Sequence, residues 1–366
     1  MERIVLKGYY GFGNLGDDIL MLTSANWLKQ SFPDCNLYVA TASDTPDYIM
    51  PFTNGLVKGI LPIAPEPQAD LLVHGGGGTF YDYHSGGLTY RLLNRLIGIM
   101  GVALFKKGLT HYRQLKGWSY SQDTRRVALG IGVSTFTADS KKYYHKVVEL
   151  SGLDVILPRD PYSLRILKGM GLPGKLIQSS DLAFLDSYWL PPDLRQDGDG
   201  KNIGFVIKNW PSDNSYLQLL KKAAILLQDQ GYTVTIYLFE KSHDCYIKTA
   251  FKGFGIEEWC PRSRSLTDYL RSLAKNDLLV TSRAHGAIIG AALNIPSLCV
   301  GIEPKLHQIA QMFPQSGQYV STKNSLTDLY SKIMMALQTP ISNVKADFTE
   351  NSRIVWDSLN KLKHLI

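Results

Sequence analysis

The chain has 366 residues, which predicts two domains because single hydrophobic cores rarely grow beyond about 250–300 residues. Hydrophobic residues make up 45% of the chain and charged residues 19%, a balance that excludes a disordered protein. The net charge of +7 favours anionic surfaces only mildly, and since no nucleic-acid-binding module accompanies it, we expect no nucleic acid partner.

Along the first half, short apolar runs alternate with segments of helical length, the pattern of βαβ units with a parallel sheet. We expect strands at Ile4–Gly8, Asn36–Thr41, Leu71–His74, Val127–Ile131, Val155–Leu157 and Leu176–Gln178. Helices are expected at Asp17–Gln30, Lys141–Leu150 and Pro161–Lys168. The polar, glycine-bearing segment 191–201 predicts a linker between domains.

The second half repeats this alternation of strands and helices. We expect strands at Ile203–Ile207, Thr233–Leu238, from Leu278 and within Asn294–Ile302, with helices at Ser215–Gln230, Ser265–Ala274 and Phe348–Ile366. The predicted domains are therefore residues 1–190 and 201–345, with residues 346–366 as a closing helix that packs back across the boundary.

The four cysteines are scattered and lack the spacing of a zinc site or a disulfide framework. We therefore expect a reducing compartment, no metal and no cofactor. Met1 is followed at once by a strand-like segment, which predicts a cytoplasmic protein without a signal peptide.

A loop after the first strand contains the pattern GxGxxG at Gly11, Gly13 and Gly16. Asp17 and Asp18 follow at the helix N-terminus, where they would repel a pyrophosphate, so the pattern does not favour a dinucleotide. The two acids either bind sugar hydroxyls, with Asp17 as a base, or only cap the helix.

Four consecutive glycines follow the apolar strand that ends at His74. Such a run costs conformational entropy on folding, so a ligand or another backbone is expected to approach closely. We predict backbone contacts to substrate from this run, with two neighbouring side chains as further sugar contacts. The residues concerned are Gly75, Gly76, Gly77, Gly78, Tyr81 and Asp82.

The stretch from Lys106 to Arg126 carries seven basic side chains, one of them histidine, against the single acid Asp123. The apolar segment Leu92–Phe105 before it is too short and interrupted to span a bilayer, which takes roughly 20 apolar residues. It forms either an interfacial helix with a basic collar on anionic lipid, or a buried helix followed by a solvated basic loop.

Two motifs predict an anion site at the sheet edge of the second half. Ser282-Arg283-Ala284-His285 stands between an apolar strand and a small-residue helix, whose free N–H groups and dipole already favour an anion. Glu303-Pro304-Lys305 follows the next strand. In the first half, Arg159 precedes a helix begun by proline and either reaches the anion or forms a surface ion pair.

Five motifs in this order resemble the polysaccharide pyruvyl transferases. They are Gly11–Asp18, the strand with Gly75–Gly78, Arg159-Asp160-x-x-Ser163, Ser180–Phe184, and Ser282–His285 with Pro304-Lys305 downstream. In the family the corner more often has leucine where this chain has Ala284, and glutamate often stands at the position of Asp18.

The resemblance implies an α/β fold of two Rossmann-like domains facing a cleft, similar to GT-B glycosyltransferases. It implies transfer of the pyruvyl group of phosphoenolpyruvate to two hydroxyls of a sugar, in a polysaccharide or its lipid-linked precursor. The products are a cyclic pyruvate ketal and phosphate. The N-terminal domain would take the acceptor and the C-terminal domain phosphoenolpyruvate. We expect a cytoplasmic enzyme, and the interfacial alternative for Leu92–Phe105 would place it at the inner face of the plasma membrane.

The chemistry of this reaction suggests roles for the residues above. Arg159 and Arg283 suit the carboxylate and phosphate of phosphoenolpyruvate, because guanidinium groups bind such anions in bidentate fashion. His285 is the candidate acid, or alternatively a residue that caps its helix. Lys305 would stabilise departing phosphate and Asp17 would act as base. The remaining predicted contacts are Ser282, Gly13 and Asn14.

Two other functions remain open from the sequence. A nucleotide-sugar-dependent GT-B glycosyltransferase would need an acid on the ribose hydroxyls, for which Glu303 is the candidate. A carbohydrate-binding scaffold without catalysis would predict a damaged cationic corner, yet Arg283 and His285 are both present.

Overall fold

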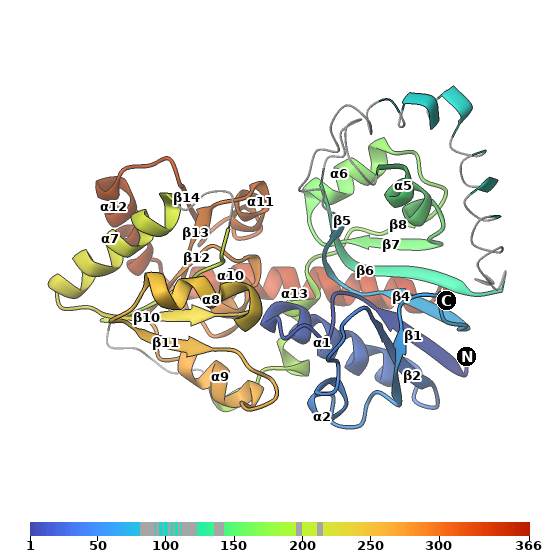
Figure 1. The fold of residues 1–366 in the computed structure, drawn as a ribbon, viewed down its shortest axis with the longest axis horizontal. Coiled ribbons are helices and arrows are strands. Elements are labelled where there is room, and N and C mark those ends of the chain that lie inside the picture. The colour runs from blue at the N-terminus through green and yellow to red at the C-terminus, as the bar shows by residue number, and fades with distance from the viewer. Residues whose placement is uncertain are drawn as a thin grey trace. The chain divides into compact units, whose positions relative to one another are not determined.

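The structure is a computed structural model that describes residues 1–80, 92, 95–97, 99–101, 104, 107–108, 111, 123–134, 143–194, 200–210 and 215–366. The chain divides into two compact units (Figure 1). Unit 1 comprises Met1–Gly11, Leu20–Leu182 and Ile354–Ile366, and unit 2 comprises Phe12–Ile19 and Ala183–Arg353. The segment with Gly13 and Asp17 thus groups with the C-terminal half of the chain.

Unit 1 is built on a parallel sheet with strand order β3-β2-β1-β4-β6-β7-β8, and β5 pairs with β6. The strands are β1 Arg3–Lys7, β2 Asn36–Thr41, β3 Gly59–Pro62, β4 Leu71–His74, β5 Gly77–Phe80, β6 Arg125–Val133, β7 Val155–Pro158 and β8 Lys175–Leu176. The helices are α1 Leu15–Ser31, α2 Ile49–Phe52, α5 Tyr143–Ser151 and α6 Pro161–Gly169. The central strand β4 is buried throughout, as a strand covered on both faces must be.

Unit 2 is built on a second parallel sheet, of order β11-β10-β9-β12-β13-β14. Its strands are β9 Asn202–Val206, β10 Thr233–Leu238, β11 Gly255–Glu258, β12 Leu278–Thr281, β13 Ser297–Gly301 and β14 Gln318–Ser321. Its helices are α7 Ser215–Asp229, α8 Lys241–Ala250, α9 Leu266–Leu273, α10 Ala284–Ala292, α11 Pro304–Gln311, α12 Leu326–Leu337 and α13 Ile341–Lys363, the last of which continues into unit 1 beyond Arg353.

Helices pack on the unit 2 sheet around a hydrophobic core. Helix α12 contacts α7 and strands β12, β13 and β14, and helix α10 contacts β12, β13 and α11 (Figure 1). Phe205 of β9 and Val280 of β12 lie fully buried in the core between these layers. Parallel strands followed by helices explain why the carboxyl ends of all six strands meet at one edge of the sheet.

The strand order of unit 2 reverses between β9 and β12, the two central strands. At such a switch point the connections leave in opposite directions, so a crevice opens at the carboxyl ends of the two strands. Lys208 follows β9 here and Ser282 follows β12. The Lys208 backbone N–H donates to the Ser282 Oγ at 2.8 Å, which ties the two strand ends together.

The switch point of unit 1 lies between β1 and β4, and a side chain fills it. Tyr10 is fully buried there, and a Cβ atom added to Gly75 would lie 2.8 Å from its Cζ. A Cβ on Gly76 would lie 3.3 Å from the carbonyl oxygens of Leu129 and Gly130. Internal packing therefore accounts for the missing side chains at these two glycines.

The other predicted glycines of this run lie in a strand rather than a loop. Gly77 and Gly78 begin β5, and Gly77 adopts a φ of 110° that favours glycine. Tyr81, Asp82 and most of the stretch from Lys106 to Arg126 lie outside the described residues. No helix among the residues that the structure describes has the length and apolar character needed to cross a membrane.

Candidate functional site

The first turn of α1 is fixed at the carboxyl end of β10. Asn14 precedes the helix, and its Oδ1 accepts the Gly16 backbone N–H at 3.1 Å, as an N-cap residue does. Its Nδ2 donates to Glu240 Oε2 at 3.0 Å, and the Leu15 backbone N–H donates to the Phe239 carbonyl at 2.9 Å. Asn14 therefore places the first turn of α1, with Asp17, at the sheet edge of unit 2.

Gly16 makes room for the imidazole of His285. A Cβ atom at Gly16 would lie 2.5 Å from His285 Cγ and 2.8 Å from Cε1, closer than real Cβ contacts come. His285 itself stands in the first turn of α10, and Arg283 is the N-cap residue of that helix. The last glycine of the GxGxxG pattern thus leaves space for the side chain of a histidine that stands about 270 residues later in the chain.

Two carboxylates hold the Arg283 guanidinium in place. Its Nη2 donates to Asp244 Oδ2 at 2.6 Å, and its Nη1 lies 3.5 Å from Glu240 Oε2. Burial disfavours the charged guanidinium, but Asp244 and Glu240 outweigh this and raise its pKa above the ordinary value. Arg283 is only 8% exposed, so its orientation is set before any ligand binds.

A second charged cluster lies at the ends of β9 and β13. Glu303 Oε1 accepts from Lys208 Nζ at 2.8 Å and lies 3.0 Å from Lys305 Nζ. Burial opposes ionisation of Glu303, but the two ammonium groups hold its pKa below the ordinary range, so the carboxylate stays charged. Lys208 Nζ also lies 4.6 Å from the ring centroid of Trp210.

Arg283 Nε, a donor, and Glu303 Oε2, an acceptor, are buried at this edge without a hydrogen-bond partner among the described residues. A buried group of this kind costs free energy when it is unsatisfied, so each one calls for an explanation. A ligand that accepts a hydrogen bond from Arg283 Nε and donates one to Glu303 Oε2 would satisfy both atoms.

The two acids at the start of α1 have separate surroundings. Asp17 is half-buried, and burial raises its pKa from 3.8 to about 6, against the lowering effect of His285. Asp18 is 1% exposed, and its Oδ2 accepts from Trp259 Nε1 at 2.7 Å. Asp17 therefore titrates near the range used in acid–base catalysis, whereas Asp18 anchors the helix.

Arg159 belongs to unit 1, where it is 2% exposed. Its Nε lies 3.3 Å from Asp160 Oδ2 and its Nη1 3.8 Å from Asp181 Oδ2. A Cβ on Gly132 would lie 2.7 Å from Arg159 Nε, so that glycine gives the guanidinium its place. The surface ion pair considered from the sequence is wrong, because the pair is buried. Its predicted contact with an anion stays a prediction.

The structure brings four predicted residues to one edge of the unit 2 sheet: Asp17, Arg283, His285 and Lys305. The last three lie close enough to lower the pKa of Asp17. Ser282 and Asn14 support this edge through the hydrogen bonds above. Gly13 adopts a φ of 70° beside Pro261 of the same unit. The sequence analysis did not identify Lys208, Glu240 and Asp244. Lys208 directly follows a predicted strand and Glu240 stands two residues after another, and this position is the one signal that marks these two residues.

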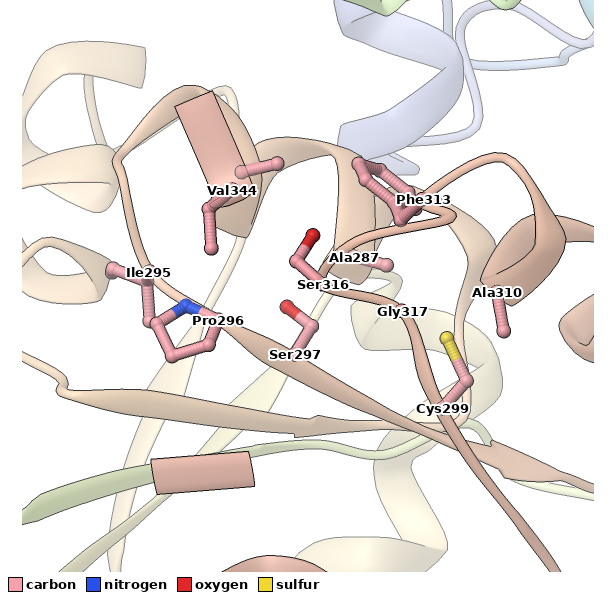
Figure 2. A pocket seen from close by; sticks show the side chains of 11 residues that line it. Ala287, Ile295, Pro296, Ser297, Cys299, Ala310, Phe313, Ser316, Gly317 and Val344 are labelled. Atoms are coloured by element: carbon pink, nitrogen blue, oxygen red, sulfur yellow. The ribbon is translucent and has the colours of Figure 1, made fainter. Parts of the chain in front are cut away.

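Unit 2 also contains a small pocket (Figure 2). Its lining includes Ala287 of α10, Cys299 of β13 and Ala310 of α11, with Phe313 just after α11. Burial raises the pKa of the Cys299 thiol to about 12, so this cysteine stays protonated. None of the residues predicted from the sequence lines this pocket.

The sequence matches the family model described as polysaccharide pyruvyl transferase over residues 14–304, most of the chain. The chain belongs to this family. The match runs from Asn14, the cap of α1, to Pro304, the first residue of α11, and so includes Asp17, Arg283 and His285. No curated protein sequence matches the chain.

Solved structures confirm the α/β fold, which is of the GT-B kind. A UDP-N-acetylglucosamine 2-epimerase from Rickettsia bellii is similar at 11% identity and a TM-score of 0.59, covering 100% of this chain and 99% of its own. The Methanocaldococcus jannaschii UDP-GlcNAc 2-epimerase, in complex with UDP-GlcNAc and UDP, has 10% identity, a TM-score of 0.58 and coverage of 98% and 99%. A spinosyn rhamnosyltransferase complexed with thymidine diphosphate has 13% identity, a TM-score of 0.53 and coverage of 100% of both chains.

Proposed function

We propose that this member of the family transfers the pyruvyl group of phosphoenolpyruvate to two hydroxyls of one sugar, in a polysaccharide or its lipid-linked precursor. The observation that carries the proposal is the joint placement of Arg283, His285 and Asp17 at the switch point of unit 2, within the stretch that matches the family. Cations and titratable groups together suit an anionic donor whose reaction moves protons.

The reaction conserves protons overall. A sugar oxygen bonds to the central carbon of phosphoenolpyruvate, its proton is lost, and the methylene carbon gains a proton to become a methyl group. A second hydroxyl of the same sugar then replaces the phosphate at that carbon. Its proton leaves with inorganic phosphate, and the ring closes as a cyclic ketal.

Each side chain has one task in this scheme. His285 donates the proton to the methylene carbon, and Asp17, with a pKa of about 6, accepts the proton of the acceptor hydroxyl. Arg283 Nε, which has no partner among the described residues, donates to the donor's anionic group. Lys208 and Lys305 stabilise the phosphate as it departs.

The test is phosphate release from phosphoenolpyruvate with a panel of hexosides and lipid-linked sugars as acceptors. We expect acceptor-dependent release by the wild type and a loss of at least about a hundredfold in Arg283→Ala. The matched control is Arg271→Ala, since Arg271 is an exposed arginine that pairs with Asp268 of its own helix α9, and its removal should leave phosphate release unchanged. Equal activity of the two variants would contradict the role of Arg283.

A second function has one observation in its favour. Similar structures are bound to UDP or thymidine diphosphate, and Glu303 Oε2 is a buried acceptor of the kind that a ribose hydroxyl would satisfy. Tight binding of a nucleotide sugar, abolished by Glu303→Gln, without phosphate release from phosphoenolpyruvate for any acceptor would favour a glycosyltransferase.

A further inference from the structure

Large apolar side chains are exposed between residues 92 and 104 of unit 1. The exposed fractions are 57% for Leu92, 59% for Leu96, 78% for Ile99, 57% for Met100 and 53% for Leu104. Eleven large hydrophobic side chains are exposed among the described residues, and five of them fall within this short span. Single exposed residues need no explanation, but a cluster marks an interaction surface.

The cluster follows the period of a helix. Leu92, Leu96 and Ile99 recur at i, i+4 and i+7, and the structure describes each of them as helical. Ile97 points elsewhere, with only 9% of its surface exposed. Gly101 follows with a φ of 83° and its N–H on the Ile97 carbonyl, so a helix ends there. The helix thus carries a buried side and an exposed apolar side.

The charge around this apolar face has one sign. Residues 83–122 contain no aspartate or glutamate, but they contain six lysines and arginines. Arg95 lies next to the apolar face and Lys107 just beyond it, and both are exposed. A second copy of this face would be repelled by the same charge, whereas an anionic surface would be attracted.

We propose that the face formed by Leu92, Leu96, Ile99, Met100 and Leu104 docks on an anionic membrane surface. The apolar side chains enter the boundary between headgroups and acyl chains, and the basic side chains remain at the lipid phosphates. This inference does not rest on the proposed reaction, because exposure, helical spacing and charge carry it alone.

The test uses the full-length protein and co-sedimentation with two kinds of vesicle, phosphatidylcholine alone and phosphatidylcholine with phosphatidylglycerol. We expect binding only to the anionic vesicles, and weaker binding at high salt. The double variant Leu96→Ser/Ile99→Ser should bind at least about tenfold more weakly for each side chain removed. Arg95→Gln/Lys107→Gln should lose about fivefold for each charge.

The matched control is Ile225→Ser/Met335→Ser, which removes two exposed apolar side chains of α7 and α12 and should bind vesicles like the wild type. Unchanged melting temperatures show that all the variants fold. Absence of binding to the anionic vesicles, or wild-type binding by Leu96→Ser/Ile99→Ser, would overturn the proposal. So would a dimer in sedimentation velocity that this variant dissociates, because it would assign the face to a second copy.

Discussion

Replacement of Gly16 by alanine tests whether the imidazole of His285 must occupy its observed place. The added Cβ would lie 2.5 Å from His285 Cγ and closer still to its Nδ1, whereas an ordinary contact begins at 3.4 Å, so the ring must shift by at least about 0.9 Å. The backbone of Gly16 is helical and needs no glycine for its own conformation, because its φ is not positive. The substitution therefore displaces the histidine without straining the backbone of Gly16.

The two consequences of Gly16→Ala have opposite signs. Alanine is favoured over glycine inside a helix by about 1 kcal/mol, which offsets the cost of moving the ring, so stability should change little. A misplacement of about 1 Å in a catalytic group costs about a hundredfold in rate. We therefore expect kcat for phosphate release to fall about a hundredfold at an unchanged melting temperature.

The control is Gly169→Ala, at a helical glycine of α6 with open space around it, which should leave kcat unchanged. A double-mutant cycle isolates the cause, since Gly16→Ala should cost nothing further once His285 is alanine. Wild-type activity of Gly16→Ala would refute the reasoning, as would a double variant much slower than His285→Ala.

Three further predictions concern stability in urea. Asp18→Leu leaves the buried Trp259 N–H without its acceptor and should cost about 1–3 kcal/mol more than Asp18→Asn, which keeps an acceptor oxygen. The folded-state pKa of Asp17 is about 6 against 3.8, so its stabilisation is complete below pH 3.8 and lost as pH rises through 6. Asp17→Asn should therefore be more stable than wild type by about 1–3 kcal/mol at pH 7 and equal to it below pH 3.8. Arg159→Ala removes the cation beside the buried carboxylates of Asp160 and Asp181 and should cost about 3–5 kcal/mol. A loss no larger than that caused by removing the exposed Arg271 would contradict the buried pairing.

The sequence predicted the central strands because full burial demands unbroken apolar runs. Strand β4, which is buried throughout, was found with the predicted bounds, and so was β10, of which the last three residues are buried. The edge strands β11 and β14 were missed, since a half-exposed segment such as Gly255–Glu258 carries no apolar period. Helix α13 begins at Ile341, ahead of the predicted Phe348, because its polar first turns hide the period.

Part of the site could be predicted from the positions of the apolar strands. Arg283 and Lys305 follow apolar strands in the sequence, and strand ends meet at one sheet edge whatever else the fold does. The partners of Arg283 could not be predicted, because Asp244 lies on a helix and nothing local marks it. The fit of Gly16 to His285 is likewise a property of packing between distant segments.

The balance of charge at the site determines how it takes up an anion. Three cationic side chains face four carboxylates: Arg283, Lys208 and Lys305 against Asp17, Glu240, Asp244 and Glu303. These charges sum to −1, so an anionic donor would be repelled, and one proton taken up with the donor would bring the sum to zero. The Asp17–His285 pair is the place for that proton, because Asp17 already has a pKa of about 6.

We therefore expect phosphoenolpyruvate to bind with uptake of about one proton near pH 7. On the imidazole this proton is the one that His285 later delivers to the methylene carbon, which leaves the Asp17 carboxylate free to accept a proton from the sugar. Calorimetry in buffers of different ionisation enthalpy measures the uptake directly. Asp17→Asn should reduce the uptake, because the site then lacks one negative charge. Binding of phosphoenolpyruvate by the wild type without proton uptake would contradict the prediction, because the fixed cations would then hold the donor without an added proton.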